Sequence, residues 1–214
     1  MSELHPATRG FGAAADLYER GRPDYPAAAV RRIVERLELG PGHRVLDLAA
    51  GTGKLTRLLV PSGASVVAVE PIPEMRAELE HRVPGVAVLD GTAERIPLAD
   101  GSVDGVTVAQ AFHWFDPDAA LREIHRVLRP RGALALVWNS RDERDPLQAE
   151  LSKIIDGLDR DIPRRHQRDW GAVLGGSDLF ERPETVRFRQ RQTVDEDGVV
   201  ARVLSISFIA AAPA

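Results

Sequence analysis

Short apolar runs alternate with amphipathic segments through the middle of the chain. The runs are rich in valine, leucine and alanine, as expected for strands buried on both faces of a sheet, and they span residues 45–48, 65–70, 86–90, 103–110 and 133–139. After the first run, Leu55, Leu58 and Leu59 recur at helical spacing. Strands that alternate with helices predict an α/β fold with a doubly wound, mostly parallel sheet.

Helices are also predicted before and after the central strands. Pro26 suits the first position of a helix that ends before Gly40, because proline is tolerated at a helix start and glycine favours a stop. Asp116 precedes Pro117 and supplies the cap of a second helix. A third helix is predicted from Pro146.

The last part of the chain carries one further strand signal. Thr185–Gln192 alternates apolar residues with arginines, which is typical of a half-buried strand. Thr193 and Glu196 follow with the spacing of a capping box, so a final helix is predicted from this point.

Composition limits the classes of function. With 214 residues, 43% of them apolar and 28% charged, the chain fits one globular domain. Cysteine is absent, which excludes disulfides, thiolate zinc sites and cysteine nucleophiles. The formal charge of −4 argues against a nucleic-acid partner. Neither a membrane-length apolar run nor a signal-peptide pattern is found, so we expect no membrane partner and a cytoplasmic protein.

A glycine loop joins the first apolar run to the helix after it. The loop reads Asp47-Leu48-Ala49-Ala50-Gly51-Thr52-Gly53. Glycine lacks a Cβ, so the backbone of such a loop turns sharply and a ligand lies close to it at the positive end of the helix. The loop therefore predicts a cofactor site, with an ordinary turn that binds nothing as the alternative.

The spacing within the loop separates the nucleotide motifs. A P-loop requires Gly-x-x-x-x-Gly-Lys and then serine or threonine, but Leu48 occupies the first glycine position and Leu55 follows Lys54. A dinucleotide fingerprint requires a third glycine where the chain has Thr56. Mg-nucleotide binding is disfavoured, and an NAD-dependent oxidoreductase stays open as a less favoured alternative.

The loop resembles the acidic-x-Gly-x-Gly-x-Gly motif of class I S-adenosylmethionine (SAM) methyltransferases. Asp47 at the strand end is the residue that neither rival motif requires. Ala49 departs from the pattern at the first glycine, and its methyl group is tolerable if φ is negative. Gly51 and Gly53 match the remaining two glycines.

Three other segments carry the same resemblance. They are the Phe…Tyr…Arg-Pro-x-Tyr-Pro segment at 11–26, the Gly-Thr-Ala-Glu-Arg-Ile-Pro segment at 91–97, and the Leu-Arg-Pro-Arg-Gly-Ala-Leu turn at 128–134, where Arg131 replaces a family glycine. The chain is thus similar to small-molecule methyltransferases of the methyltransferase type 11 kind. That resemblance implies a Rossmann-like sheet of order 3-2-1-4-5 with one further strand.

The resemblance implies where SAM binds. Glu70 ends the second strand beside the glycine loop, and its carboxylate accepts hydrogen bonds from both ribose hydroxyls. Thr92 and Ala93 stand where the family binds adenine, with threonine in place of an aspartate. Gln110 ends the fourth strand near the methionine ammonium, and Tyr18 lies in a lid over the methionine end.

Two other lid residues and two less certain positions complete the predicted site. Arg22 and Tyr25 are expected in the lid with Tyr18. The alternative is that they only pack the N-terminal segment against the core. Asp90 is a second candidate for the adenine contact, or merely the end of its strand. His113 follows the fourth strand and is a candidate catalytic base on the acceptor side, with packing between aromatic residues as the alternative.

We therefore expect SAM-dependent methyl transfer to a small-molecule acceptor without a metal. A non-catalytic SAM-binding domain is the alternative. One domain spans 1–214, with a lid and first helix at 1–40, a SAM-binding core at 41–139, an acceptor-side region at 140–183 and a last strand and helix at 184–214. Three arginines of the acceptor-side region, Arg164, Arg165 and Arg168, either contact an anionic substrate or form a solvated face.

The edge of the sheet raises one more expectation. The family ends its sheet with a hairpin strand that has no counterpart before Ala214. The fifth strand then has a free edge, which we expect Thr185–Gln192 to cover by direct pairing, with self-association as the alternative.

Overall fold

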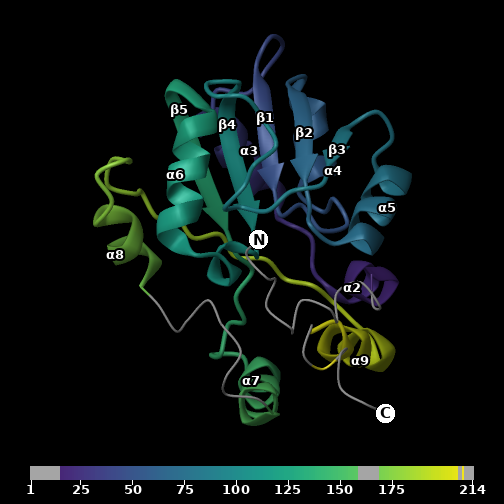
Figure 1. Cartoon of the computed structure of the whole chain (residues 1–214). Helices are drawn as coiled ribbons and strands as arrows, with labels where there is room; N and C mark the ends of the chain where they lie inside the picture. Colours follow the sequence, from purple (N-terminus) through teal and green to yellow (C-terminus); the bar gives the residue numbers. More distant parts are fainter. Residues whose placement is uncertain (1–14, 159–168, 207–208, 210–214) are drawn as a thin grey trace.

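The computed structural model describes residues 15–158, 169–206 and 209 of the chain. A parallel sheet with the strand order β3-β2-β1-β4-β5 lies at its centre (Figure 1). In chain order the strands are β1 (Arg44–Leu48), β2 (Ser65–Val69), β3 (Ala87–Leu89), β4 (Val103–Ala109) and β5 (Leu128–Val137). The doubly wound fold is confirmed, and the strand order reverses between β1 and β4, where such folds bind ligands.

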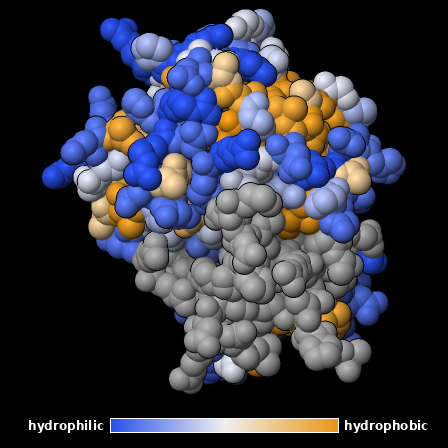
Figure 2. All heavy atoms as spheres, in the orientation of Figure 1, coloured by the Kyte–Doolittle hydropathy of each residue, from blue (hydrophilic) through white to orange (hydrophobic). Residues whose placement is uncertain are grey.

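Helices cover both faces of this sheet. In chain order they are α2 (Ala15–Gly21), α3 (Ala27–Arg36), α4 (Thr56–Leu59), α5 (Pro73–Arg82), α6 (Pro117–Val127), α7 (Pro146–Leu158), α8 (Trp170–Gly175) and α9 (Glu196–Leu204), with short 3-10 turns at Val60–Ser62 and Phe112–Trp114. Ile33 of α3 packs on the face that carries Val45, and Ile124 of α6 packs on the face that carries Leu46. Figure 2 shows apolar side chains between α6 and α5 on the visible face.

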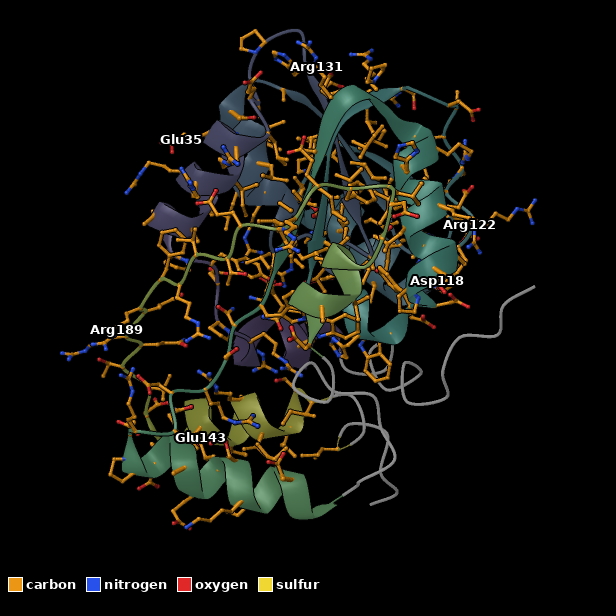
Figure 3. All side chains as sticks on the ribbon, turned by 90° about the vertical axis from the view of Figure 1, so that its left-hand side faces the viewer. Glu35, Asp118, Arg122, Arg131, Glu143 and Arg189 are labelled. Atoms are coloured by element: carbon orange, nitrogen blue, oxygen red, sulfur yellow. The ribbon has the colours of Figure 1, made fainter. Side chains whose placement is uncertain are left out.

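Three helices lie beyond the carboxyl ends of the strands. Figures 1 and 3 place α2, α7 and α9 there, with α9 next to α2. None of the helices within the described ranges is long and apolar enough to cross a membrane. The carboxyl edge, where the sequence places the site, is therefore the edge that these helices adjoin.

The predicted starts of α3, α6 and α7 are confirmed to within one residue. Asp116 caps α6 by accepting a hydrogen bond from the N–H of Ala119 at 3.0 Å, and Pro117 is its first residue. Pro26 lies at the N-cap of α3 and not inside the helix. The start of the last helix is wrong: Asp195, which accepts from the N–H of Gly198 at 2.9 Å, caps α9 in place of Thr193.

The predicted strand at Thr185–Gln192 is wrong. Within the described residues no strand follows β5, and Val186 and Phe188 are 45% and 39% exposed. The chain instead crosses the outer edge of β5, as Figure 3 shows, because Phe180 packs on α6 and Glu184 binds α3. Glu184 accepts from Arg32 at 2.6 Å, so the chain just before residue 185 lies against α3.

Candidate functional site

The glycine loop turns sharply at the carboxyl end of β1. Three of its residues have left-handed backbone: Ala49 (φ 54°), Gly51 (φ 59°) and Gly53 (φ 83°). The expectation of a negative φ at Ala49 is wrong. A residue with a Cβ adopts this conformation at a cost of about 1 kcal/mol, so Ala49 holds a glycine conformation at the position where the motif has glycine.

The two glycines of the loop have different tasks. A Cβ built on Gly51 would meet no atom of the described residues within 4 Å, so open space lies beside it. A Cβ on Gly53 would lie 3.0 Å from Leu79 and 3.1 Å from Val83. Gly51 therefore borders the site, and Gly53 permits close packing of the loop on α5.

Glu70 lies beside the loop, as its place at the end of β2 predicts. Its side chain is 4% exposed and accepts hydrogen bonds from the N–H of Gly51 at 2.9 Å and of Ile72 at 3.0 Å. Burial raises the pKa of this carboxyl to about 7, against the two backbone bonds and the charge of Arg76. Glu70 is thus a buried acceptor at the strand-order reversal, poised to change its charge near neutral pH.

Asp47 lies beneath the loop and holds it in place. It is fully buried, and its two oxygens accept from the hydroxyls of Thr56 at 2.6 Å and Thr107 at 2.9 Å. Burial raises the pKa of this carboxyl to about 6, although both hydroxyl bonds lower it. These bonds tie β1 to α4 and β4, so we assign Asp47 to positioning the loop, and its direct contact with a cofactor stays a prediction.

Helix α2, which lies in the segment predicted to form a lid, is anchored to the same loop by Glu19. Glu19 accepts from the hydroxyl of Thr52 at 2.7 Å and from Arg57 at 2.6 Å, and Lys54 lies 3.4 Å from it. Lys54 also lies 3.3 Å from Asp24. Roles for Glu19 and Thr52 were not predicted, and Lys54 was considered only as a P-loop residue. Its place directly after Gly53 was the one available signal.

The aromatic residues of the lid segment lie at the carboxyl ends of the strands. Tyr25 is buried, and the side chain of Gln110, just past β4, lies near its hydroxyl. Burial raises the pKa of Tyr18, and the charge of nearby Glu70 raises it further. The guanidinium of Arg22 lies 5.5 Å from the centre of the Tyr18 ring. The structure thus brings Tyr18, Gln110 and Glu70 to the same edge, as predicted.

The predicted adenine segment follows β3. Thr92 and Arg95 form a backbone bridge with N–H to O distances of 3.4 and 3.2 Å, and Ala93 is buried at the bend between them. Asp90, the second candidate, is exposed and pairs with Arg76 at 3.0 Å. Arg76 also donates to the backbone oxygen of Glu70 at 2.8 Å, so Asp90 supports the end of β2.

His113 lies in the 3-10 turn just past β4. Its ring is half-buried, with its centre 5.1 Å from that of Trp114. Phe112, the preceding residue, is fully buried and packs edge-on against Trp170 of α8, which fixes the turn. His113 therefore lies at the predicted edge, while its catalytic role stays a prediction. Arg164, Arg165 and Arg168 lie outside the described residues.

Comparisons with known proteins match this geometry. The family described as "Methyltransferase domain" matches residues 46–136, which include every predicted cofactor residue except Tyr18. An uncharacterised methyltransferase of Mycobacterium tuberculosis is 51% identical over 184 residues, which are 80% of this chain and 74% of that protein. The chain belongs to the methyltransferase family.

Two further methyltransferases extend the match. A demethylmenaquinone methyltransferase of Beutenbergia cavernae is 40% identical over 70% of this chain and 68% of its own length. The crystal structure of a SAM-dependent methyltransferase from Aquifex aeolicus has a TM-score of 0.53 and 25% identity, covering 67% of this chain and 86% of that one. The protein is an enzyme, a SAM-dependent methyltransferase.

The residues around the glycine loop fit SAM as the cofactor. Gly51 leaves space on the side where a ligand lies against the loop, and Glu70 offers two acceptor oxygens beside it. Thr56, at the place of the third glycine in the dinucleotide motif, is fully buried and bonded to Asp47, which disfavours the NAD alternative.

Proposed function

We propose that this methyltransferase transfers the methyl group of SAM to a small-molecule acceptor. The observation that carries the proposal is the anchoring of α2 over the glycine loop, since Glu19 binds Thr52 and Arg57 and thereby brings a lid against the site. A covered site suits a small acceptor better than a macromolecular one. The formal charge of −4 also disfavours nucleic acid, and one relative carries the name of a quinone-precursor methyltransferase.

The residues of the loop and of β2 are proposed to hold the cofactor. Glu70 would accept hydrogen bonds from the ribose hydroxyls. The backbone at Ala49 and Gly51 would lie along the part of SAM between the ribose and the sulfur. Asp47 and Thr56 keep the loop in its left-handed conformation.

The remaining predicted contacts lie at the two ends of the cofactor. Thr92 and Ala93 are proposed to bind adenine, and Gln110 and Tyr18 are proposed to adjoin the methionine end. Gln110 is held in place by its N–H, which donates to the backbone oxygen of Val137 at 2.9 Å, and its side chain lies near the Tyr25 hydroxyl.

Methyl transfer from SAM requires mainly that the protein aligns the acceptor with the methyl group. SAM supplies a methyl group that its sulfonium already activates. The protein places the acceptor in line with that group, excludes water and accepts a proton if the acceptor carries one. We propose His113 for the last task, because it follows β4 at the carboxyl edge. The single-domain division and the cytoplasmic location stay predictions.

A labelling experiment tests the proposal. The protein is incubated with SAM that carries a radioactive methyl group and with a cell extract divided into metabolite, protein and nucleic-acid fractions. We expect label in the metabolite fraction, and strongly reduced labelling with Glu70→Ala. Label that enters only protein or nucleic acid would overturn the small-molecule assignment.

A further inference from the structure

Lys54 directly follows the glycine loop and is buried against the N-terminal part of the chain. Its ammonium lies 3.4 Å from a carboxylate oxygen of Glu19 and 3.3 Å from one of Asp24. Glu19 belongs to α2, and Asp24 lies in the turn after that helix. The lysine that was considered only as a P-loop residue therefore contacts two acids of the predicted lid.

Arg57, three residues further along the chain, contacts the same two acids. Its Nη1 donates to Glu19 and its Nη2 donates to Asp24, each at 2.6 Å. Two cations at the start of α4 thus face two carboxylates of the predicted lid, and the four charges balance one another. We call Glu19, Asp24, Lys54 and Arg57 the ion clasp.

The ion clasp is joined to the part of the loop that borders the cofactor site. One carboxylate oxygen of Glu19 contacts both cations, and the other accepts from the hydroxyl of Thr52 at 2.7 Å. Thr52 is fully buried and lies between Gly51 and Gly53, the two glycines with left-handed backbone. A movement of α2 away from the loop therefore breaks the bond to Thr52 and separates the opposite charges of the ion clasp.

The two halves of the ion clasp differ in burial. The side chains of Glu19 and Lys54 are each 9% exposed, whereas that of Asp24 is 53% exposed. A buried charge that loses its partner is costly, while an exposed ion pair is weak and screened by salt. The buried half favours the closed position of α2, and the exposed half makes the closed position sensitive to ions.

Helix α2 is also held by α9, which lies next to it (Figures 1 and 3). A Cβ on Gly21 would lie 2.3 Å from the backbone oxygen of Ala201, so the two helices are in close contact. Nη2 of Arg22 donates to the backbone oxygen of Ser205 at 3.3 Å, just past α9. Neither contact involves the ion clasp, so α2 can leave the loop and stay folded against α9.

We propose that Lys54 is a positioning residue of this methyltransferase, which holds α2 closed on the glycine loop and thereby slows release of the cofactor. The proposal rests on the proposed cofactor site at this loop. Lys54 acts through Glu19 and Asp24 and contacts no reacting atom. Release of the cofactor requires the ion clasp to open, and added salt favours its opening.

Two measurements on the full chain test the proposal. The first is the rate at which radiolabelled S-adenosylhomocysteine (SAH) leaves the protein after rapid mixing with excess unlabelled SAH. The second is hydrogen exchange of the α2 amides without any ligand. Lys54→Met removes the ammonium and keeps an unbranched side chain, and it should speed SAH release and α2 exchange at least fivefold each. Salt should speed release from the unmodified protein more than from Lys54→Met.

Matched variants separate this role from a general effect of charge. Lys153→Met is the control, because Lys153 is the other lysine of the chain, is exposed and is paired with Glu150 at 2.6 Å. It should leave both rates unchanged, and Lys54→Arg, which keeps the charge, should restore slow release. If Lys54→Met fails to fold, the exposed Asp24→Asn takes its place and should speed release several-fold.

A double variant tests whether Lys54 acts through the lid. Lys54→Met combined with Glu19→Gln should speed release by less than the product of the two single effects, because both substitutions break the same contact. Single effects that multiply would overturn the proposal, and so would unchanged rates in Lys54→Met. Exchange that becomes faster throughout the chain, and not selectively in α2, would show that Lys54 only stabilises the fold.

Failure of the proposed function gives a different result. If SAH does not bind at all, the cofactor site at the glycine loop is contradicted. The exchange of the α2 amides needs no ligand, so it still decides whether Lys54 holds α2 closed. Equal α2 exchange in Lys54→Met and in the unmodified protein would contradict the ion clasp itself.

Discussion

The affinity for SAH should depend on the protonation of Glu70. Burial raises the pKa of this carboxyl to about 7, so near neutral pH about half of the molecules carry it as the neutral acid before SAH binds. Ribose hydroxyls that donate to the carboxylate favour its charged form and lower the pKa in the complex. Binding should therefore release a proton, and SAH should bind more tightly as the pH rises.

The size of the effect follows from the two pKa values. With a pKa of about 7 before binding and a pKa in the complex low enough to keep the carboxylate ionised at pH 6, affinity at pH 8 exceeds that at pH 6 by about tenfold, or about 1.4 kcal/mol. The same group acts on stability with the opposite sign. Because folding raises the pKa of Glu70 above its ordinary value of 4.5, its stabilising contribution is full below pH 4.5 and is lost as the pH rises through 7.

The assay is calorimetric titration of SAH at pH 6, 7 and 8 in buffers with different heats of ionisation, which also counts the released protons. Glu70→Gln should remove the pH dependence and weaken binding at pH 8 by about 1.5 to 3 kcal/mol, the scale of hydrogen bonds to a charged group. The exposed Glu74→Gln is the matched control and should keep the full dependence. The reasoning is refuted if the unmodified protein shows no slope, or if Glu70→Gln keeps it.

Three other predictions concern the loop, the lid and the acceptor side. Ala49→Gly should raise the free energy of unfolding in urea by up to about 1 kcal/mol, because glycine adopts the left-handed φ without strain. The control is Ala50→Gly, which should lower the free energy of unfolding by about 0.5 to 1 kcal/mol because the backbone at Ala50 is not left-handed. Equal effects of the two substitutions would show that Ala49 is unstrained. Glu19→Gln should loosen α2, so that trypsin cleaves after Arg20 at least several times faster than in the unmodified protein. Equal cleavage rates would mean that Glu19 does not hold α2 against the loop. His113→Ala should lower turnover at saturating SAM while SAH affinity stays within about twofold, and a parallel loss of both would contradict an acceptor-side role.

The central sheet was predictable because its signals are local. Apolar runs with the length of buried strands, separated by helical stripes, predict a parallel sheet, whereas its order 3-2-1-4-5 was implied by the family resemblance. Asp116 with Pro117 marks the start of α6 without any tertiary information. Glu70 was placed correctly for the same reason: the carboxyl ends of neighbouring parallel strands meet at one edge.

Other features depend on partners far away in the sequence. The alternation in Thr185–Gln192 fits a strand, yet pairing with β5 also depends on where the preceding chain is held, and Glu184 is paired with Arg32 of α3. The left-handed Ala49 follows from closure of the loop over Asp47, which no pattern of residues encodes directly. Its one signal was its place at a motif glycine.

The most direct test of the account is calorimetry of the purified protein with SAM, SAH and NAD, each titrated alone. The account predicts that SAM and SAH each bind at one site per chain and that NAD does not bind, because Thr56 occupies the third glycine position of a dinucleotide loop and its hydroxyl is bonded to Asp47. Binding of NAD together with failure to bind either sulfur ligand would contradict it.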